Sequence, residues 1–114
     1  MKLLSAALII ALTALSVAPA IASERQIHIY AKNFSFTPGT ITLEVHQRAK
    51  LVFVGKGNHG ITIPEIGLNR IVTIGTKPTI VEVTPGHIGT FIARCAIYCG
   101  IGHGKMVLKV KVVK

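Results

Sequence analysis

The sequence predicts an all-β protein, an antiparallel Greek-key β-sandwich or barrel, and three observations predict it. Short segments alternate between apolar and polar residues, and turn signals rich in Pro, Gly and Asn separate them at close spacing. No stretch after residue 22 has the 3.6-residue periodicity of an amphipathic helix. The length after that point suits seven or eight short strands.

The predicted strands follow one another in chain order. Alternation predicts strands at 26–31 and 40–45, and the turn Thr37-Pro38-Gly39 precedes the second of them. The apolar run 51–54 predicts a buried strand, which the Gly-Lys-Gly-Asn turn at 55–58 ends. Further strands are expected at 60–63, 71–74, 79–83 and 90–94. The last strand is expected to begin near Met106, with Leu108, Val110 and Val112 facing inward and Lys109 and Lys111 facing outward.

The first 22 residues read as an export signal. Lys2 supplies a positive start, Leu3–Val17 is an apolar run, and Ala20-Ile21-Ala22 is a small-x-small cleavage site before Ser23. The alternative is an uncleaved anchor helix, because 3–22 is just long enough to span a bilayer. Either interpretation predicts one domain at 23–114, in the periplasm or at the outer face of the cytoplasmic membrane.

The composition is strongly basic. The chain has a formal net charge of +9, with 13 Lys and Arg against four acidic residues, all of them Glu. Such a surface favours acidic partners, such as an acidic redox protein or an anionic membrane. Export and the scattering of the cations argue against nucleic acid. Without an Asp there is no Ser/His/Asp set, and we expect no independent catalytic site.

One segment carries most of the chemistry. Residues 95–106 read Cys-x3-Cys-x3-His-x2-Met, formed by Cys95, Cys99, His103 and Met106 in a glycine-rich loop between two predicted strands. Thiolate and thioether are soft ligands and imidazole is intermediate, so this set suits copper. We expect His59 to join it, because a turn directly precedes this residue and can place it at the same end of the sandwich.

Other interpretations of this segment remain. A Cys95–Cys99 disulfide would close a very short loop and would leave the other ligand-type residues unexplained. Structural zinc would leave Met106 unused. A mononuclear copper site would use Cys99, His59, His103 and Met106 and leave Cys95 idle. A copper chaperone or donor to an oxidase would have a more exposed site. Within any copper site, His87 is the second choice as the upstream ligand.

The chain from about residue 33 to 113 resembles the CuA domain of cytochrome c oxidase subunit II, a domain also found at the end of nitrous-oxide reductase. It is most similar to the short subunits II of B-type haem-copper oxidases. The pieces that carry the resemblance are Phe34–Gly39, His59-Gly60-Ile61, Pro64–Leu68 and the Cys-to-Met loop. The resemblance implies a cupredoxin-like fold and electron transfer through two copper ions, in a periplasmic shuttle or an oxidase subunit.

The resemblance also implies a role for each ligand. Cys95 and Cys99 would each bridge both coppers, and His59 and His103 would each bind one. Met106 would make a weak contact to one copper and the backbone carbonyl of Ile97 a weak contact to the other; the family usually has Glu at the position of Ile97. The implied partners are a cytochrome c-like or cupredoxin donor and a haem-copper oxidase acceptor. This chain departs from the family in lacking Trp and the acidic docking residues that receive basic cytochromes.

Overall fold

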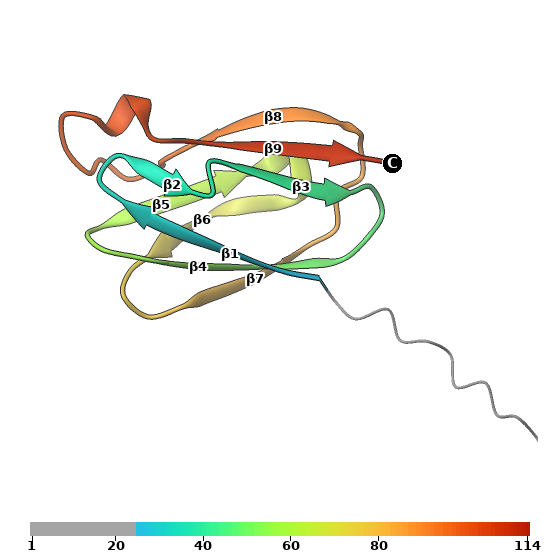
Figure 1. Cartoon of the computed structure of the whole chain (residues 1–114), viewed down its shortest axis with the longest axis horizontal. Coiled ribbons are helices and arrows are strands. Elements are labelled where there is room, and N and C mark those ends of the chain that lie inside the picture. Colours follow the sequence, from blue (N-terminus) through green and yellow to red (C-terminus); the bar gives the residue numbers. More distant parts are fainter. Residues whose placement is uncertain (1–24) are drawn as a thin grey trace, which may run out of the picture.

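The computed structural model describes residues 25–114, which form a β-sandwich of nine strands (Figure 1). The expected signal peptide or anchor at 1–22 lies outside the described residues. The strands are β1 (Arg25–Lys32), β2 (Ser35–Thr37), β3 (Thr40–Glu44), β4 (Ala49–Gly55), β5 (His59–Ile63), β6 (Leu68–Ile74), β7 (Thr79–Val83), β8 (Gly89–Arg94) and β9 (Val107–Val113). Two short 3₁₀ turns complete them, η1 (Pro64–Ile66) and η2 (His103–Lys105). Over 25–114 no helix is long and apolar enough to cross a membrane.

The strands form two main sheets and a ribbon. One sheet has the order β2-β1-β4-β7, the other the order β3-β9-β8, and β5 pairs with β6. The expected antiparallel pairing holds for β1–β2, β4–β7, β5–β6 and β8–β9. The pairs β1–β4 and β3–β9 are parallel, which is a correction in detail to the predicted sheet. Alternation fixes which face of a strand is buried but not the direction of its neighbour, so the sequence could not reveal these two pairs.

The apolar faces predicted from alternation are confirmed. The inward side chains of the first, third and last strands are buried, except for the half-buried Ile27, and the run in β4 packs on both faces, as expected for a central strand. These side chains form one contiguous core, in which Phe53 is the largest fully buried side chain. The core members taken from the predicted faces are Ile29, Ala31, Ile41, Leu43, Leu51, Phe53, Leu108, Val110 and Val112.

The sequence pattern did not predict β2, and it predicted a strand only at 71–74, where β6 spans Leu68–Ile74. The three residues of β2 are too few to show a period, and the strand exists because it pairs with β1 from Tyr30↔Thr37 to Lys32↔Ser35. Strand β6 begins at Leu68 because η1 turns the chain back onto β5, where Thr62 Oγ1 donates a hydrogen bond to the Leu68 carbonyl at 2.9 Å.

Strand direction gathers four connections at one end of the sandwich, which we call the cysteine end: residues 32–34, 55–59, 75–78 and 94–106 (Figure 1). Strands β1, β4, β6 and β8 run toward it, and β5 and β9 run away from it. The opposite end, which we call the far end, holds residues 44–48, 64–68 and 84–88 (Figure 1).

Candidate metal centre

Backbone hydrogen bonds fix the start of the cysteine loop. Cys95 N–H donates to the Met106 carbonyl at 3.0 Å, and Ala96 N–H donates to the Gly60 carbonyl at 2.7 Å. An isolated antiparallel bridge also joins Ile61 to Cys95. The first cysteine is therefore tied to both β5 and the start of β9, so three segments distant in sequence meet at one point.

The second half of the loop is folded by its own short turn. His103 N–H donates to the Gly100 carbonyl at 3.1 Å, and Met106 N–H donates to the His103 carbonyl at 3.2 Å. Arg94 Nη1 donates to the Gly104 carbonyl at 3.2 Å and ties the loop to the end of β8. This turn brings the His103 and Met106 side chains to the cysteines.

The sulfur and nitrogen atoms of the loop converge. The two cysteine Sγ atoms are 3.9 Å apart, and both thiols are free. Cys99 Sγ lies 3.7 Å from His103 Nδ1 and 3.8 Å from Met106 Sδ. Two ligands bound at about 2.3 Å to one tetrahedral metal stand about 3.8 Å apart. The loop therefore holds its donors at the separation that a shared metal requires, and the disulfide alternative is not formed.

His59 completes the cluster from the start of β5. Its ring is fully buried, and Nε2–H donates to the Lys56 carbonyl at 2.7 Å. Because a carbonyl only accepts, Nδ1 carries the free lone pair, and this buried atom has no hydrogen-bond partner among residues 25–114. The ligand atoms of His59, Cys95 and Cys99 all lie within 4.8 Å of one another.

An unpartnered imidazole nitrogen beside two thiols fits copper. Buried polar atoms nearly always have a partner, and each exception needs an explanation. A metal bound at His59 Nδ1 would supply the partner, and the Lys56 carbonyl would hold the ring in the correct tautomer, as outer-shell carbonyls do in metal sites. The donor set of thiolate, thioether and imidazole matches copper better than zinc.

The environment of Cys99 favours its neutral thiol. Burial, and then the hydrogen bond and the charge of Cys95, raise the pKa of Cys99, while a backbone hydrogen bond opposes the shift. A metal must displace this proton, because the thiolate is the ligand form. Copper binding at this cluster therefore competes with protonation.

Ile97 brings its carbonyl into the cluster and its side chain over the neighbouring strand. Cys95 Sγ donates a hydrogen bond to the Ile97 carbonyl at 3.1 Å. A Cβ atom at Gly60 would stand 2.7 Å from Ile97 Cδ1 and 3.1 Å from Ile71 Cγ2. Glycine at position 60 thus lets two isoleucines cover the backbone next to His59. From the sequence, Gly60 was only part of a stretch that carries the family resemblance, and Lys56 and Ile71 had no role at the site, since none of the three is of a ligand type.

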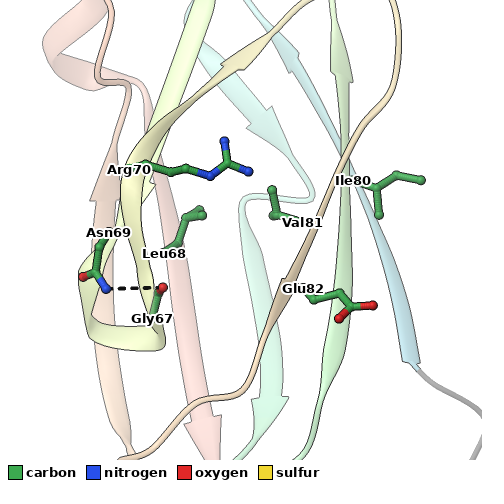
Figure 2. Close-up of a pocket in the computed structure, with 7 residues that line it drawn as sticks. All are labelled: Gly67, Leu68, Asn69, Arg70, Ile80, Val81 and Glu82. Atoms are coloured by element: carbon green, nitrogen blue, oxygen red, sulfur yellow. Dashed lines mark hydrogen bonds between the residues drawn. The ribbon is translucent and has the colours of Figure 1, made fainter.

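Two other locations do not join this cluster. His87 lies in the turn before β8, at the far end, away from the cluster that His59 forms with the cysteines. An open hollow of about 430 Å³ lies between β6 and β7, where Asn69, Arg70 and Glu82 line it (Figure 2). Its lining contains no cysteine, histidine or methionine, so it is not a second copper site.

The profile of the family described as "Cupredoxin-like domain" matches residues 5–108. The chain belongs to this family. The family and the fold agree with a copper site at the end of the sandwich where the thiols, imidazoles and thioether meet.

This cupredoxin is also similar to proteins of respiratory oxidases. A stretch of 32 residues is 53% identical to a "Probable cytochrome c oxidase subunit 2" of Streptomyces coelicolor, and it spans 28% of this chain and 10% of that relative. The match is therefore only about a tenth of the relative's length.

Solved structures share the fold. The periplasmic domain of subunit II of cytochrome oxidase from Bradyrhizobium japonicum superposes with a TM-score of 0.69 at 14% identity, covering 79% of this chain and 84% of that one. A chain of a heme-copper terminal oxidase dimer gives a TM-score of 0.65 at 20% identity, covering 80% of this chain and 66% of that one. At these identities the likeness shows the fold.

Proposed function

We propose that this cupredoxin binds a dinuclear copper (CuA) centre and transfers electrons through it. The observation that carries the proposal is the pair of free thiols 3.9 Å apart, with two imidazoles nearby. His59 groups with both sulfurs, and His103 contacts Cys99. Two thiols that share their surroundings in this way are suited to bridging two metal ions.

Each ligand has a task that follows from its position. Cys95 and Cys99 would bridge, His59 Nδ1 and His103 Nδ1 would each bind one copper, and the Met106 thioether and the Ile97 carbonyl would make the weak contacts. A thiolate-bridged copper pair takes up and releases one electron with little change in bond lengths. The chain supports that property by holding Cys95 between β5 and β9 and by keeping water from the buried His59 and Met106.

A mononuclear copper site is the second candidate, and one observation favours it. His103 Nδ1 and Met106 Sδ both approach Cys99, and the ligand atom of His59 lies within 4.8 Å of the same sulfur. These four residues could hold one copper by themselves, with Cys95 as a bystander.

Matched cysteine variants separate the two candidates. For a CuA centre we expect two copper ions per purified chain and an EPR spectrum of one electron shared by two coppers. Cys95→Ser and Cys99→Ser should then both abolish that spectrum. If Cys95→Ser keeps its copper and its spectrum while Cys99→Ser loses both, the site is mononuclear and the dinuclear proposal is wrong.

The proposal extends to the setting of the protein. We infer that residues 1–22 direct export, as a cleaved signal or an anchor, and that domain 23–114 works outside the cytoplasmic membrane. There it would pass electrons from a cytochrome c-like or cupredoxin donor to a haem-copper oxidase, as a shuttle or as a subunit. In that setting, catalysis would reside in the acceptor.

A further inference from the structure

Within residues 25–114, cations occur along the whole sandwich, but carboxylate side chains are absent from one end. The cysteine end carries five exposed cations and no carboxylate: Lys32, Lys56, Lys77, Arg94 and Lys105. The three carboxylates within residues 25–114 lie toward the far end. Glu44 ends β3, Glu65 is in η1, and Glu82 pairs in register with Lys50 near the start of β4. The basic charge therefore acts unopposed around the candidate metal centre.

The cysteine end also exposes apolar side chains. Ile101 is fully exposed and Tyr98 is 73% exposed, both in the loop that carries the ligands. The exposed Phe34 ring packs against the same loop, since a Cβ atom at Gly102 would overlap it. The Tyr98 ring centroid lies 5.5 Å from that of His103, so an aromatic surface residue touches a proposed ligand.

We propose that the cysteine end is the docking surface for an acidic one-electron redox protein, with Phe34, Tyr98 and Ile101 as the dry centre and the five cations as the rim. The inference rests on the proposed electron-transfer function. The rim would attract and orient a partner that carries carboxylates around its redox group. The apolar centre would exclude water where Tyr98 meets His103. The partner loses one electron and the copper centre gains one, with no bond or proton exchanged.

A protein fits this face better than a membrane surface. The described chain enters the sandwich at Arg25, at the far end (Figure 1). If the segment before it were held at a membrane, the cysteine end would point away from that membrane. Among the proposed ligands, Cys99 and His103 in this loop are half-buried, whereas His59, Cys95 and Met106 are buried, so the loop on this face offers an electron a short way in.

The test uses the copper-loaded exported protein and two probes, small c-type cytochromes of similar size, one acidic and one basic. We expect the reduced acidic cytochrome to transfer its electron faster in stopped-flow mixing, with a rate that falls as salt rises. Lys105→Glu and Lys32→Glu should each lower that rate about 3- to 10-fold. Lys111→Glu makes the same charge change on β9, away from this end, and should leave the rate within about twofold.

A second matched pair tests the apolar centre. Ile101→Ser should weaken binding of the acidic cytochrome, while Ile88→Ser, which replaces a 60% exposed residue at the far end, should not. Binding is measured by calorimetry on the copper-free protein as well. The docking result is therefore obtained even if the copper centre is mononuclear, and the two proposals fail separately.

Three outcomes would overturn the docking proposal. The first is a faster reaction with the basic cytochrome, or a rate that does not respond to salt. The second is an equal loss of rate in Lys111→Glu and Lys105→Glu, which would mean that only total charge matters. The third is binding of the protein to phosphatidylglycerol vesicles and not to phosphatidylcholine vesicles, if Lys32→Glu and Lys105→Glu abolish that binding. That result would assign the face to an anionic membrane instead.

Discussion

The two ends of this sandwich share one core but differ in chemistry. At the cysteine end, backbone bonds tie Cys95 to β5 and β9, and a buried imidazole nitrogen stands without a partner beside two free thiols. At the far end, the connections are turns with exposed polar side chains, such as His46 and His87, and with the carboxylates Glu44 and Glu65. Similar residue types therefore have different surroundings at the two ends.

This difference shows that the fold confines the proposed function to one edge. The core between the sheets stabilises both ends, so a stable sandwich does not by itself explain the buried His59 or the apolar cover of Ile97 and Ile71. These features make sense as the preparation of a ligand site, which needs side chains held in place before the metal arrives. Matched substitutions at the two ends can test that interpretation.

The largest difference is expected between two histidines. His59→Ala removes a buried ring and the donor to the Lys56 carbonyl, so the free energy of unfolding of the copper-free protein should fall by about 2 kcal/mol. Copper content and the optical spectrum should be lost. His87→Ala at the far end should change stability by less than about 0.5 kcal/mol and keep the spectrum. Denaturant unfolding measures the stability of both variants, and the copper content per chain measures their metal binding. If His59→Ala bound as much copper as the unchanged protein, His59 would not be a ligand.

A smaller contrast is expected between two glycines. Gly60→Ala places a Cβ atom 2.7 Å from Ile97 Cδ1 and Cγ1, so that side chain must move, at a cost of about 1–3 kcal/mol. Gly86→Ala at the far end meets no atom within 4 Å and should leave stability unchanged or raise it by up to about 1 kcal/mol.

A double variant sharpens the contrast between the glycines. Because Ile97→Ala removes the atoms that clash, Gly60→Ala should cost less in its presence than alone. Thermal unfolding of the four proteins in this cycle gives the coupling. Strict additivity would mean that Ile97 does not cover Gly60 in solution.

The smallest effect is a pH dependence confined to the cysteine end. The pKa of the Cys99 thiol is raised, first by burial and then by Cys95, so its proton must leave when copper binds. Apparent copper affinity, measured against a competing chelator, should therefore rise with pH through and beyond the ordinary cysteine range. The copper-free fold should show the opposite trend, because the unfolded chain ionises this thiol more easily and stability falls as pH rises past that range.

A control at the far end completes the pH comparison. His46→Ala and His87→Ala should leave the pH dependence of copper affinity unchanged, since both side chains lie away from the ligand cluster. A change in either variant, or an affinity that does not vary with pH, would contradict the assignment of the proton to Cys99.

Much of the fold could be predicted from the sequence because the signal is local. Alternation identified the buried faces of β1, β3 and β9, and turn residues separated the strands near their observed bounds. The pattern could not give β2, which exists only through its pairing with β1, or the parallel partners of β1 and β3. Pairing depends on how distant segments share the core, and period-2 alternation carries no information about that.

The candidate site, like the fold, could be predicted from the sequence only in part. The sequence by itself determined the ligand types in Cys95–Met106 and, with a turn before it, pointed to His59, because soft donors at close spacing are a local chemical pattern. Only the tertiary structure decided that His59 Nδ1 would be buried without a partner, that Ile97 and Ile71 would cover Gly60, and that the end with the ligand cluster would carry cations but no carboxylate among residues 25–114. The physical reason is that distances across the sandwich are set by strand direction and core packing, which join residues that the chain order keeps far apart.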